Sequence, residues 1–342
     1  MSTKIPATIV TGFLGAGKTS LVRHLVEHAG GRRLALLINE FGDLGVDRGI
    51  LGGCGIADCR EEDVIELANG CICCTVADDF LPAMRTILAR DPSPDHIVIE
   101  TSGLALPKPL VAAFNWPEVR SRLTVDGVLV VADAAAVRDG RFAHDPDAVQ
   151  AERAADPALD HETPLEELFE EQLGCGDLVL VNKADQVAEP ERAGVEAAIR
   201  AELRPGVRLL WTSHGKVDPA VALGLGVGVE ADLANRPSHH DGGEEHGHDE
   251  FDSFVLAVPP LADPAPLVDR LKEAIRRHDI LRVKGFLVVA GKPMRHVVQA
   301  VGERVDRYYD RPWRPGEGGA GELVVIGLKG LDRDAIGTAV LG

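Results

Sequence analysis

The sequence predicts an α/β fold with a doubly wound, mostly parallel sheet, followed by a smaller α+β domain. In the first two thirds of the chain, short apolar runs alternate with helical patterns, as in βαβ units. A glycine-rich pattern of the kind that binds phosphate lies between the first apolar run and the first helical pattern. Near residue 225 the alternation ends, and beyond residue 250 a different order of elements begins.

The apolar runs of the first part are predicted to be strands. They are ATIVTG, RLALLINE, DHIVIETSG, DGVLVVADA, DLVLVNKAD and VRLLWTS. Most are nearly continuous rather than alternating, which is typical of parallel strands covered by helices on both faces. Helices are predicted between them, for example over residues 18–28 and 163–173. We expect this domain to span residues 1–225.

Residues 226–250 are rich in glycine, histidine and acidic residues and have no apolar period, which predicts a linker. In residues 251–342, SFVLAV indicates a strand, and Asp263 and Pro264 indicate the start of a helix. The apolar positions of that helix are Leu267, Leu271 and Ile275. ILRVKGFLVVAG, RHVVQAVGERVDRYY and ELVVIGLKG are predicted strands, and LDRDAIGTAVLG a short helix. This pattern favours a small α+β domain with a largely antiparallel sheet.

Charge and composition argue against several function classes. The formal net charge of −18 disfavours binding to nucleic acid, which needs a basic surface. Aromatic residues make up only 4% of the chain, too few for a platform that stacks bases. The sequence has neither a signal-peptide pattern nor an apolar run long enough to span a membrane, so we expect a cytoplasmic protein without membrane contact. In the cytoplasm, clustered cysteines are more often metal ligands or redox groups than disulfides.

GFLGAGKT, residues 12–19, matches the pattern G-x-x-x-x-G-K-[ST] between a strand and a helix. The glycines let backbone N–H groups fold around phosphates, Lys18 supplies a positive charge, and the Thr19 hydroxyl is placed to coordinate Mg²⁺. The predicted nucleotide-binding residues of this loop are Gly12, Gly15, Ala16, Gly17, Lys18, Thr19 and Ser20.

VNKAD follows a buried strand, so Asn182, Lys183 and Asp185 are expected at the carboxyl edge of the sheet, where such folds bind ligands. A fixed carboxylate can accept hydrogen bonds from N1–H and the 2-amino group of guanine, whereas adenine would leave it buried and unpaired. A solvated turn is the alternative, but the phosphate loop upstream favours guanine. Ser213 and His214, in WTSHGK, are expected in a second loop at the base.

IVIETSG should deliver Glu100 to the sheet edge beside the phosphate loop, where a carboxylate can hold Mg²⁺ or its water. The backbone N–H of Gly103 is expected to approach the γ-phosphate. Lys18, Thr19 and Glu100 thus form the predicted catalytic set of a site that hydrolyses GTP, with water as the nucleophile. The sequence shows no evident glutamine or arginine finger for this step, so intrinsic turnover should be slow.

NGCICCTVADDF gathers Cys71, Cys73 and Cys74 at the start of a predicted helix. A helix N-terminus lowers the pKa of a thiol and favours the thiolate that binds metal. We interpret these cysteines as a site for a transient divalent ion. Thiolates suit Zn²⁺ or Co²⁺, and the usual order of affinities does not choose cobalt over zinc.

Other interpretations of the cysteines stay open. Cys71 and Cys74 have the spacing of a redox pair, and Cys54 and Cys59 could complete a structural zinc site. The linker adds candidates for weak metal binding, against the alternative of a solvated spacer: His239, His240, His246 and His248. His24 and His28 are predicted on a solvated helix face, and Cys175 in packing.

INEFGDLGVD, after the second strand, is the expected switch segment, with Glu40, Asp43 and Asp47 as candidates that respond to nucleotide. Glu40 and Asp47 are also candidate metal ligands. If GTP orders the metal ligands, metal affinity rises when GTP is bound, and by linkage metal raises GTP affinity. Hydrolysis would then release the ion.

GFLGAGKT, INEFGDLGVD, ELANGCICCTV, ETSG, NKAD and the histidine-rich linker, in this order, resemble the CobW family of P-loop GTPases over nearly the whole chain. The resemblance implies GTP and Mg²⁺ as ligands, and metal bound by Cys71 and Cys73 in the nucleotide-bound state. It also implies that Co²⁺ is delivered to a metal-acceptor protein, a cobaltochelatase subunit, in cobalamin biosynthesis. The alternatives are a zinc chaperone of the same family and a GTPase with a structural zinc. The oligomeric state is left open, with a nucleotide- or metal-dependent dimer as one option.

Overall fold

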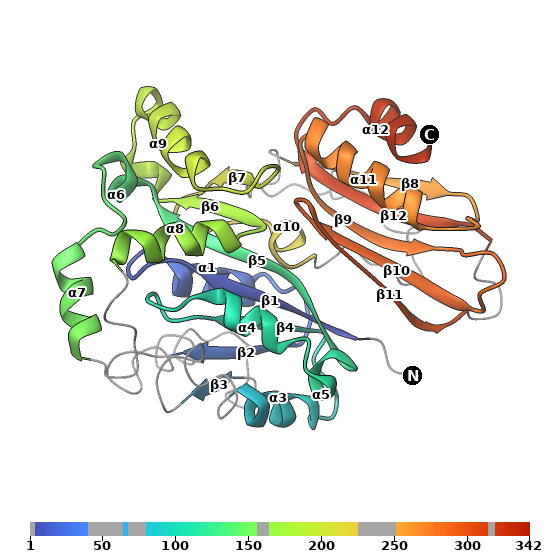
Figure 1. The fold of residues 1–342 in the computed structure, drawn as a ribbon, viewed down its shortest axis with the longest axis horizontal. Helices are drawn as coiled ribbons and strands as arrows, with labels where there is room; N and C mark the ends of the chain where they lie inside the picture. Colours follow the sequence, from blue (N-terminus) through green and yellow to red (C-terminus); the bar gives the residue numbers. More distant parts are fainter. Residues whose placement is uncertain (1–3, 40–63, 68–79, 156–163, 225–250, 314–318) are drawn as a thin grey trace. The chain divides into compact units, whose positions relative to one another are not determined.

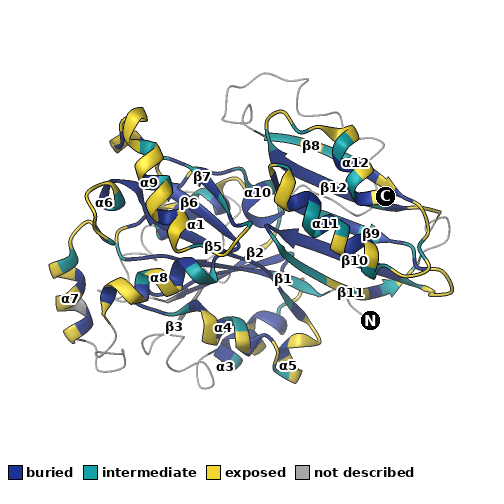
Figure 2. Ribbon diagram, turned by 45° about the horizontal axis from the view of Figure 1, so that its top comes forward, coloured by how far each residue is buried: buried dark blue, intermediate teal, exposed yellow. Residues whose placement is uncertain are grey.

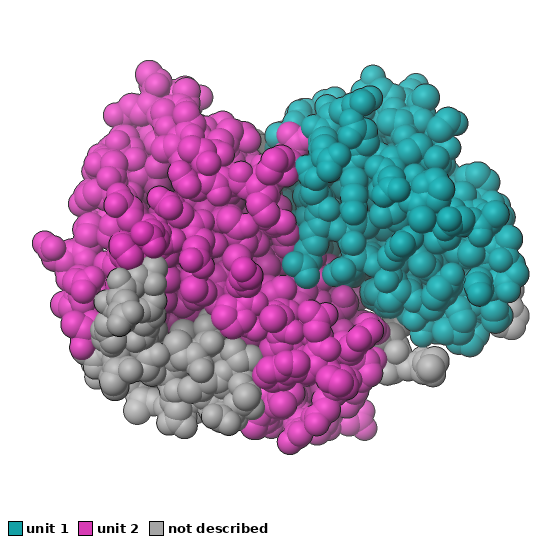
Figure 3. All heavy atoms as spheres, in the orientation of Figure 1, with its two compact units in different colours: residues 1–3, 218–342 teal, residues 4–217 magenta. Residues whose placement is uncertain are grey.

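The computed structural model divides the chain into two compact units, residues 4–217 and residues 218–342 (Figures 1 and 3). The described residues are 4–39, 64–67, 80–155, 164–224, 251–313 and 319–342. Each unit has its own sheet and its own apolar core.

The amino-terminal unit is built on a parallel sheet with the strand order β3-β2-β4-β1-β5-β6-β7. The strands are β1 (Ile5–Thr11), β2 (Leu34–Asn39), β3 (Val64–Leu67), β4 (His96–Glu100), β5 (Leu123–Asp133), β6 (Leu178–Asn182) and β7 (Arg208–Trp211). Every residue of β4 and β6 is buried, as expected for strands covered on both faces. Figure 2 colours the strands by burial and labels β6 among them. Since β1 lies between β4 and β5, the segment after β1 begins at the centre of the sheet's carboxyl edge.

Helices follow the strands of this unit in the doubly wound pattern. They are α1 (Lys18–Glu27), α3 (Leu81–Leu88), α4 (Pro107–Ala113), α5 (Pro117–Arg120), α6 (Ala134–Arg138), α7 (Pro146–Ala155), α8 (Leu165–Cys175) and α9 (Glu189–Ala201), with the 3₁₀ turn η3 (Ala184–Gln186). α3 and α4 share one apolar cluster with β1, β2, β4 and β5, while α9 shares another with β5 to β7. In α1 the apolar positions at helical spacing, Leu21, Val22, Leu25 and Val26, are the ones buried.

The carboxyl-terminal unit is an antiparallel sheet with the order β11-β10-β9-β12-β8 and two longer helices. Its elements are α10 (Pro219–Leu223), β8 (Phe251–Val258), α11 (Ala265–Arg277), β9 (Ile280–Leu287), β10 (Met294–Val301), β11 (Arg304–Pro312), β12 (Gly321–Leu328) and α12 (Arg333–Leu341). Leu267, Leu271 and Ile275 of α11 pack with Ile336 and Val340 of α12 against the sheet. One core therefore serves both helices and all strands except the edge strand β11, whose Val305 only borders it.

The predicted fold class is confirmed in both units. The predicted strand over residues 295–309 is a hairpin, because Gly302 has a φ of 52° and turns the chain between β10 and β11. The predicted helix start is close: α11 begins at Ala265, whose N–H donates to Asp263 Oδ1 at 2.9 Å. The predicted linker, residues 226–250, lies outside the described residues.

Candidate nucleotide-binding site

The glycine-rich loop joins β1 to α1 at the centre of the sheet's carboxyl edge. Gly12, Gly15 and Gly17 have φ angles of 135°, 73° and 105°, which side-chain-bearing residues rarely adopt. A Cβ at Gly12 would lie 2.1 Å from the carbonyl oxygen of Val131, and one at Gly17 would lie 2.3 Å from Asn182 Nδ2. Gly17 is the N-cap of α1 and offers no side chain to its N–H groups. The loop can therefore approach a phosphate closely and point backbone donors at it.

Lys18, Thr19 and Glu100 meet at the start of α1. Lys18 is 7% exposed and its Nζ donates to the carbonyl oxygen of Phe13 at 3.1 Å. Thr19 Oγ1 donates to Glu100 Oε1 at 2.8 Å, and Glu100, the last residue of β4, is 6% exposed. A partly buried hydroxyl and a buried carboxylate beside a helix N-terminus are the hard oxygen donors that Mg²⁺ prefers. The three predicted catalytic residues are thus brought together, and Thr19 and Glu100 fit the predicted ion.

The loop after β4 lies against the glycine-rich loop. The N–H of Thr101 donates to the carbonyl oxygen of Val10 at 3.0 Å, and its Oγ1 donates to Thr11 Oγ1 at 3.0 Å. A Cβ at Gly103 would lie only 2.6 Å from the backbone nitrogen of Leu14. Glycine is required at 103 because two backbones approach each other here. The predicted approach of its N–H to a γ-phosphate stays a prediction.

Asn182 joins two loops of the site. It is 2% exposed, its Nδ2 donates to the carbonyl oxygen of Ala16 at 2.8 Å, and its Oδ1 accepts from the N–H of Gly215 at 3.0 Å. The sequence predicted that this side chain contacts the base. In the structure its amide ties the glycine-rich loop to the loop after β7, so Asn182 sets the spacing of these two loops. Its contact with a base stays a prediction.

The remaining predicted base-binding residues lie side by side. The N–H of Asp185 donates to Ser213 Oγ at 3.2 Å, and the Asp185 side chain is exposed. His214, exposed as well, has a φ of 57° in the tight turn that precedes Gly215. The structure therefore brings NKAD and the predicted second loop together at the edge of the sheet. Contact between Asp185 and a base stays a prediction.

Lys183 is held by Asp133, which was not among the predicted site residues. Lys183 Nζ lies 2.5 Å from Asp133 Oδ2, and Asp133 is 2% exposed. The other carboxylate oxygen, Oδ1, accepts from the N–H groups of Ala135 and Ala136, so Asp133 is also the N-cap of α6. The only local signal was an aspartate between a buried strand and an alanine run, which predicts a helix cap but not an ion pair with a residue fifty positions away.

The predicted ligands of the transition-metal ion and the predicted switch residues lie outside the described residues. They are Glu40, Asp43, Asp47, Cys54, Cys59, Cys71, Cys73, Cys74, His239, His240, His246 and His248. Within the described ranges, no three or more His, Cys, Asp or Glu side chains form a group that could hold a metal ion.

The structure changes the interpretation of one predicted surface pair. His24 is half-buried rather than solvated, and its Nε2 is 2.9 Å from the carbonyl oxygen of Val217. Burial, and then the neighbouring His28 ring at 4.2 Å between centroids, lower the pKa of His24 below its usual value. His28 is exposed, as predicted. Cys175 is partly buried, which raises the pKa of its thiol and suits the predicted packing role.

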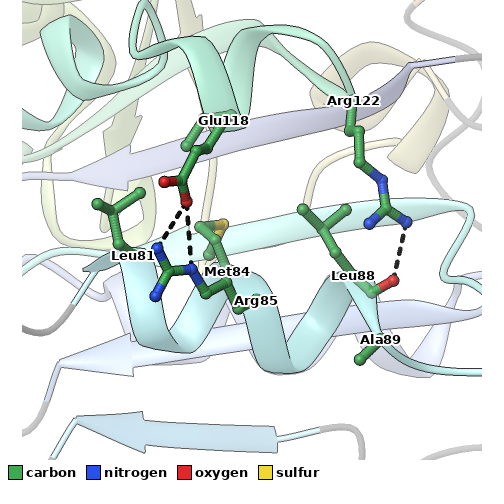
Figure 4. A pocket seen from close by; sticks show the side chains of 8 residues that line it. Leu81, Met84, Arg85, Leu88, Ala89, Glu118 and Arg122 are labelled. Carbon is green, nitrogen blue, oxygen red and sulfur yellow. Dashed lines mark hydrogen bonds and ion pairs between the residues drawn. The ribbon is translucent and has the colours of Figure 1, made fainter.

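A groove of about 310 Å³ lies between α3 and α5 and is separate from the nucleotide site (Figure 4). An exposed ion pair, Arg85 Nη2 to Glu118 Oε2 at 2.7 Å, crosses it, and Arg122 donates to the carbonyl oxygen of Leu88 at 2.8 Å. Glu118 and Arg122 directly precede β5, whereas the glycine-rich loop follows β1. Since the strands are parallel, the two sites lie at opposite edges of the sheet.

Comparisons with known proteins agree with this geometry. The family model "CobW/HypB/UreG, nucleotide-binding domain" matches residues 6–210, and the model "Cobalamin synthesis protein cobW C-terminal domain" matches residues 251–341. A Sinorhizobium protein named "Zinc chaperone CobW" is 56% identical over 341 residues, which cover 98% of this chain and 96% of that protein. A Pseudomonas aeruginosa protein of the same name is 52% identical over 339 residues, 97% of this chain and 90% of that one.

Among solved structures, the Zn(II)-bound YjiA GTPase from E. coli is 24% identical, with a TM-score of 0.41 and 98% of each chain covered. No helix in the described ranges is long and apolar enough to cross a membrane. The strand order, the phosphate loop and the two family matches, which follow one another along the chain, point to the same conclusion. The chain belongs to the CobW/HypB/UreG family, and its amino-terminal unit is a P-loop GTPase.

Proposed function

We propose that the chain is a GTP-dependent metallochaperone, which binds a divalent transition metal at Cys71 and Cys73 when GTP is bound and releases it after hydrolysis. The observation that carries the proposal is the hydrogen bond between Thr19, which is partly buried, and Glu100, which is buried, at the start of α1. It supplies a nucleotide-sensitive centre in a chain that also gathers three cysteines between residues 71 and 74. The names of the two relatives described above support a chaperone role.

At the nucleotide site, each residue has a distinct task. Lys18 and the N–H groups at the start of α1 bind the phosphates. Thr19 and Glu100 would hold Mg²⁺, which when bound neutralises charge on the β- and γ-phosphates. Gly103 places its backbone against the phosphate loop, and Asp185 selects guanine. Asn182 keeps the loops at a fixed distance from each other.

The cargo is a borderline divalent ion, and zinc is the first candidate because both relatives are named zinc chaperones. Cobalt, its delivery to a cobaltochelatase and a role in cobalamin biosynthesis rest on the resemblance of the motifs alone. In either case the partner is a metal-acceptor protein. A cytoplasmic location and a nucleotide- or metal-dependent dimer belong to this proposal as well.

The first test is a titration with Co²⁺, and with Zn²⁺ as a competitor, in the presence of Mg²⁺ and a non-hydrolysable GTP analogue. Tetrahedral Co²⁺ bound by thiolates should give visible charge-transfer bands that the Cys71→Ser/Cys73→Ser variant loses. Cys175→Ser, which changes the partly buried cysteine of α8, should keep them. Equal bands with GDP would mean that the cysteines form a structural metal site and do not carry cargo. Bands that disappear only when the linker histidines are removed would mean that the protein stores metal independently of GTP.

Replacing Asp133 with asparagine should weaken the binding of GTP and GDP alike by about tenfold, because Lys183 loses a charged, buried partner. An asparagine oxygen can still cap α6, so the fold should be retained. Fluorescent GTP and GDP analogues would measure both dissociation constants. Asp139→Asn is the matched control, since Asp139 is an exposed carboxylate that pairs with Arg138 and Arg141 at the other end of α6. Unchanged affinities in Asp133→Asn would show that Lys183 takes no part in nucleotide binding.

A further inference from the structure

Gln172, in α8, is a fully buried side chain that contacts the loop after β4. It is 0% exposed, and its Nε2 donates to the carbonyl oxygens of Gly103 and Ala105, both at 3.0 Å. The amide can point only one way, because the opposite orientation would turn its oxygen toward two carbonyl oxygens. Its Oε1 has no hydrogen-bond partner among the described residues. The amide of Gln172 therefore acts as a hydrogen-bond donor to these two carbonyl groups.

The loop that Gln172 contacts is fixed from two sides. On one side Gly103 lies against the backbone of Leu14 in the phosphate loop, and Thr101 is hydrogen-bonded to Val10 and Thr11 of β1. On the other side, the Gln172 amide holds the two peptide planes that follow residues 103 and 105. The loop starts directly after Glu100, so the position of the loop also constrains the backbone at Glu100.

An apolar cluster shields this contact from water. Leu104 and Ala105 pack with Phe13 of the phosphate loop and with Leu165 and Leu168 of α8. The rings of Phe13 and Phe169 are also in contact, with centroids 5.7 Å apart. In such surroundings a hydrogen bond is electrostatically stronger than in water, and a shift of α8 would move the loop with it.

We propose that Gln172 is a positioning residue for GTP hydrolysis: it holds the loop of residues 101–106 against the phosphate loop in the arrangement that a γ-phosphate requires. This inference rests on the roles proposed above for Glu100 and Gly103. GDP lacks the γ-phosphate, so the contact matters for GTP and for the hydrolytic step but not for GDP.

The variant Gln172→Met tests this, because methionine fills a similar volume and cannot donate a hydrogen bond. We expect kcat for GTP hydrolysis to fall by about 10- to 100-fold, since small displacements of positioned groups have effects of this size. The ratio of affinities for a non-hydrolysable GTP analogue and GDP should fall, while GDP affinity itself stays the same. Glu171→Met, an exposed neighbour on α8, is the matched control and should behave as the parent protein.

A second variant keeps the test decisive if Gln172→Met does not fold. Gln172→Asn retains the amide but is one methylene shorter, so it cannot reach both carbonyl oxygens, and its kcat should lie between those of Gln172→Met and the parent. Equal losses of GTP-analogue and GDP affinity, with kcat retained, would overturn the proposal and leave Gln172 a structural residue. If Glu100→Gln is also without effect on hydrolysis, the proposed nucleotide roles fail as a whole, which separates that outcome from failure of Gln172 alone.

Discussion

Replacing Asp310 with alanine should lower the free energy of unfolding of the carboxyl-terminal unit by about 3–5 kcal/mol. Arg295 of β10 and Asp310 of β11 form an ion pair whose side chains are only 4% and 1% exposed. Arg295 Nε lies 3.2 Å and 3.1 Å from the two carboxylate oxygens, and its guanidinium lies over the Phe286 ring at 5.6 Å. Removing the carboxylate leaves a buried positive charge without this partner, which costs more than the net contribution of the intact pair.

Urea unfolding would measure the loss through the fluorescence of Trp313, whose ring contacts Phe286 at 5.4 Å between centroids. Trp116 and Trp211, in the other unit, would be replaced by phenylalanine in the reference protein and in every variant, so that Trp313 alone reports unfolding.

Two further variants show whether the loss in Asp310→Ala comes from the unpaired buried charge. In the double variant Arg295→Met/Asp310→Leu, apolar side chains replace both charges, and most of the stability should return. Glu273→Ala removes an exposed carboxylate that pairs with Arg276 and Arg277 on α11, and should leave the midpoint nearly unchanged. A loss below about 1 kcal/mol in Asp310→Ala would contradict the prediction, because it would mean that other groups or water compensate the charge of Arg295.

Much of the fold could be predicted because its signals are local. The buried strands of the parallel sheet are continuous apolar runs, and the phosphate loop follows the first of them directly. The start of β5 was less visible: the strand begins at Leu123, three residues before the predicted segment, and its first part contains Thr124 and the buried Asp126. The pairing of β1 with β5 shifts register between Ala7 and Thr8, an irregularity that no residue pattern announces.

In the candidate site too, the residues with local sequence signals could be predicted and those that act across long sequence separations could not. Lys18, Thr19, Glu100 and Gly103 were predicted because each belongs to a short motif whose spacing carries the chemistry. Asp133 and Gln172 were not, because they act on residues about fifty and seventy positions away, and glutamine in a helix has no special local signature. Asn182 was found, but its role in joining two loops depends on the approach of Ala16 and Gly215, which only the folded chain shows.

Replacing Glu100 with glutamine should lower kcat/KM for GTP hydrolysis by about 100-fold. Glutamine has nearly the same shape, and its oxygen can still accept the hydrogen bond that Thr19 now donates at 2.8 Å. What it lacks is the negative charge, in a position that is 6% exposed and poorly screened by water. Measuring kcat/KM over a range of Mg²⁺ concentrations should show that the variant needs more Mg²⁺, with GDP binding in the absence of Mg²⁺ unaffected. Glu118→Gln, an exposed carboxylate of α5, is the control.

A double-mutant cycle with Thr19→Val decides whether Thr19 and Glu100 serve the same ion. Valine removes the hydroxyl while keeping the branched shape, so each single variant should lose one contribution to the same Mg²⁺ site. If both groups act on that ion, kcat/KM of the double variant Thr19→Val/Glu100→Gln should be only slightly lower than that of the less active single variant, because effects on a shared site are not additive. Losses that multiply would mean that the two residues act independently. The 2.8 Å contact would then be a structural hydrogen bond and not part of an ion site.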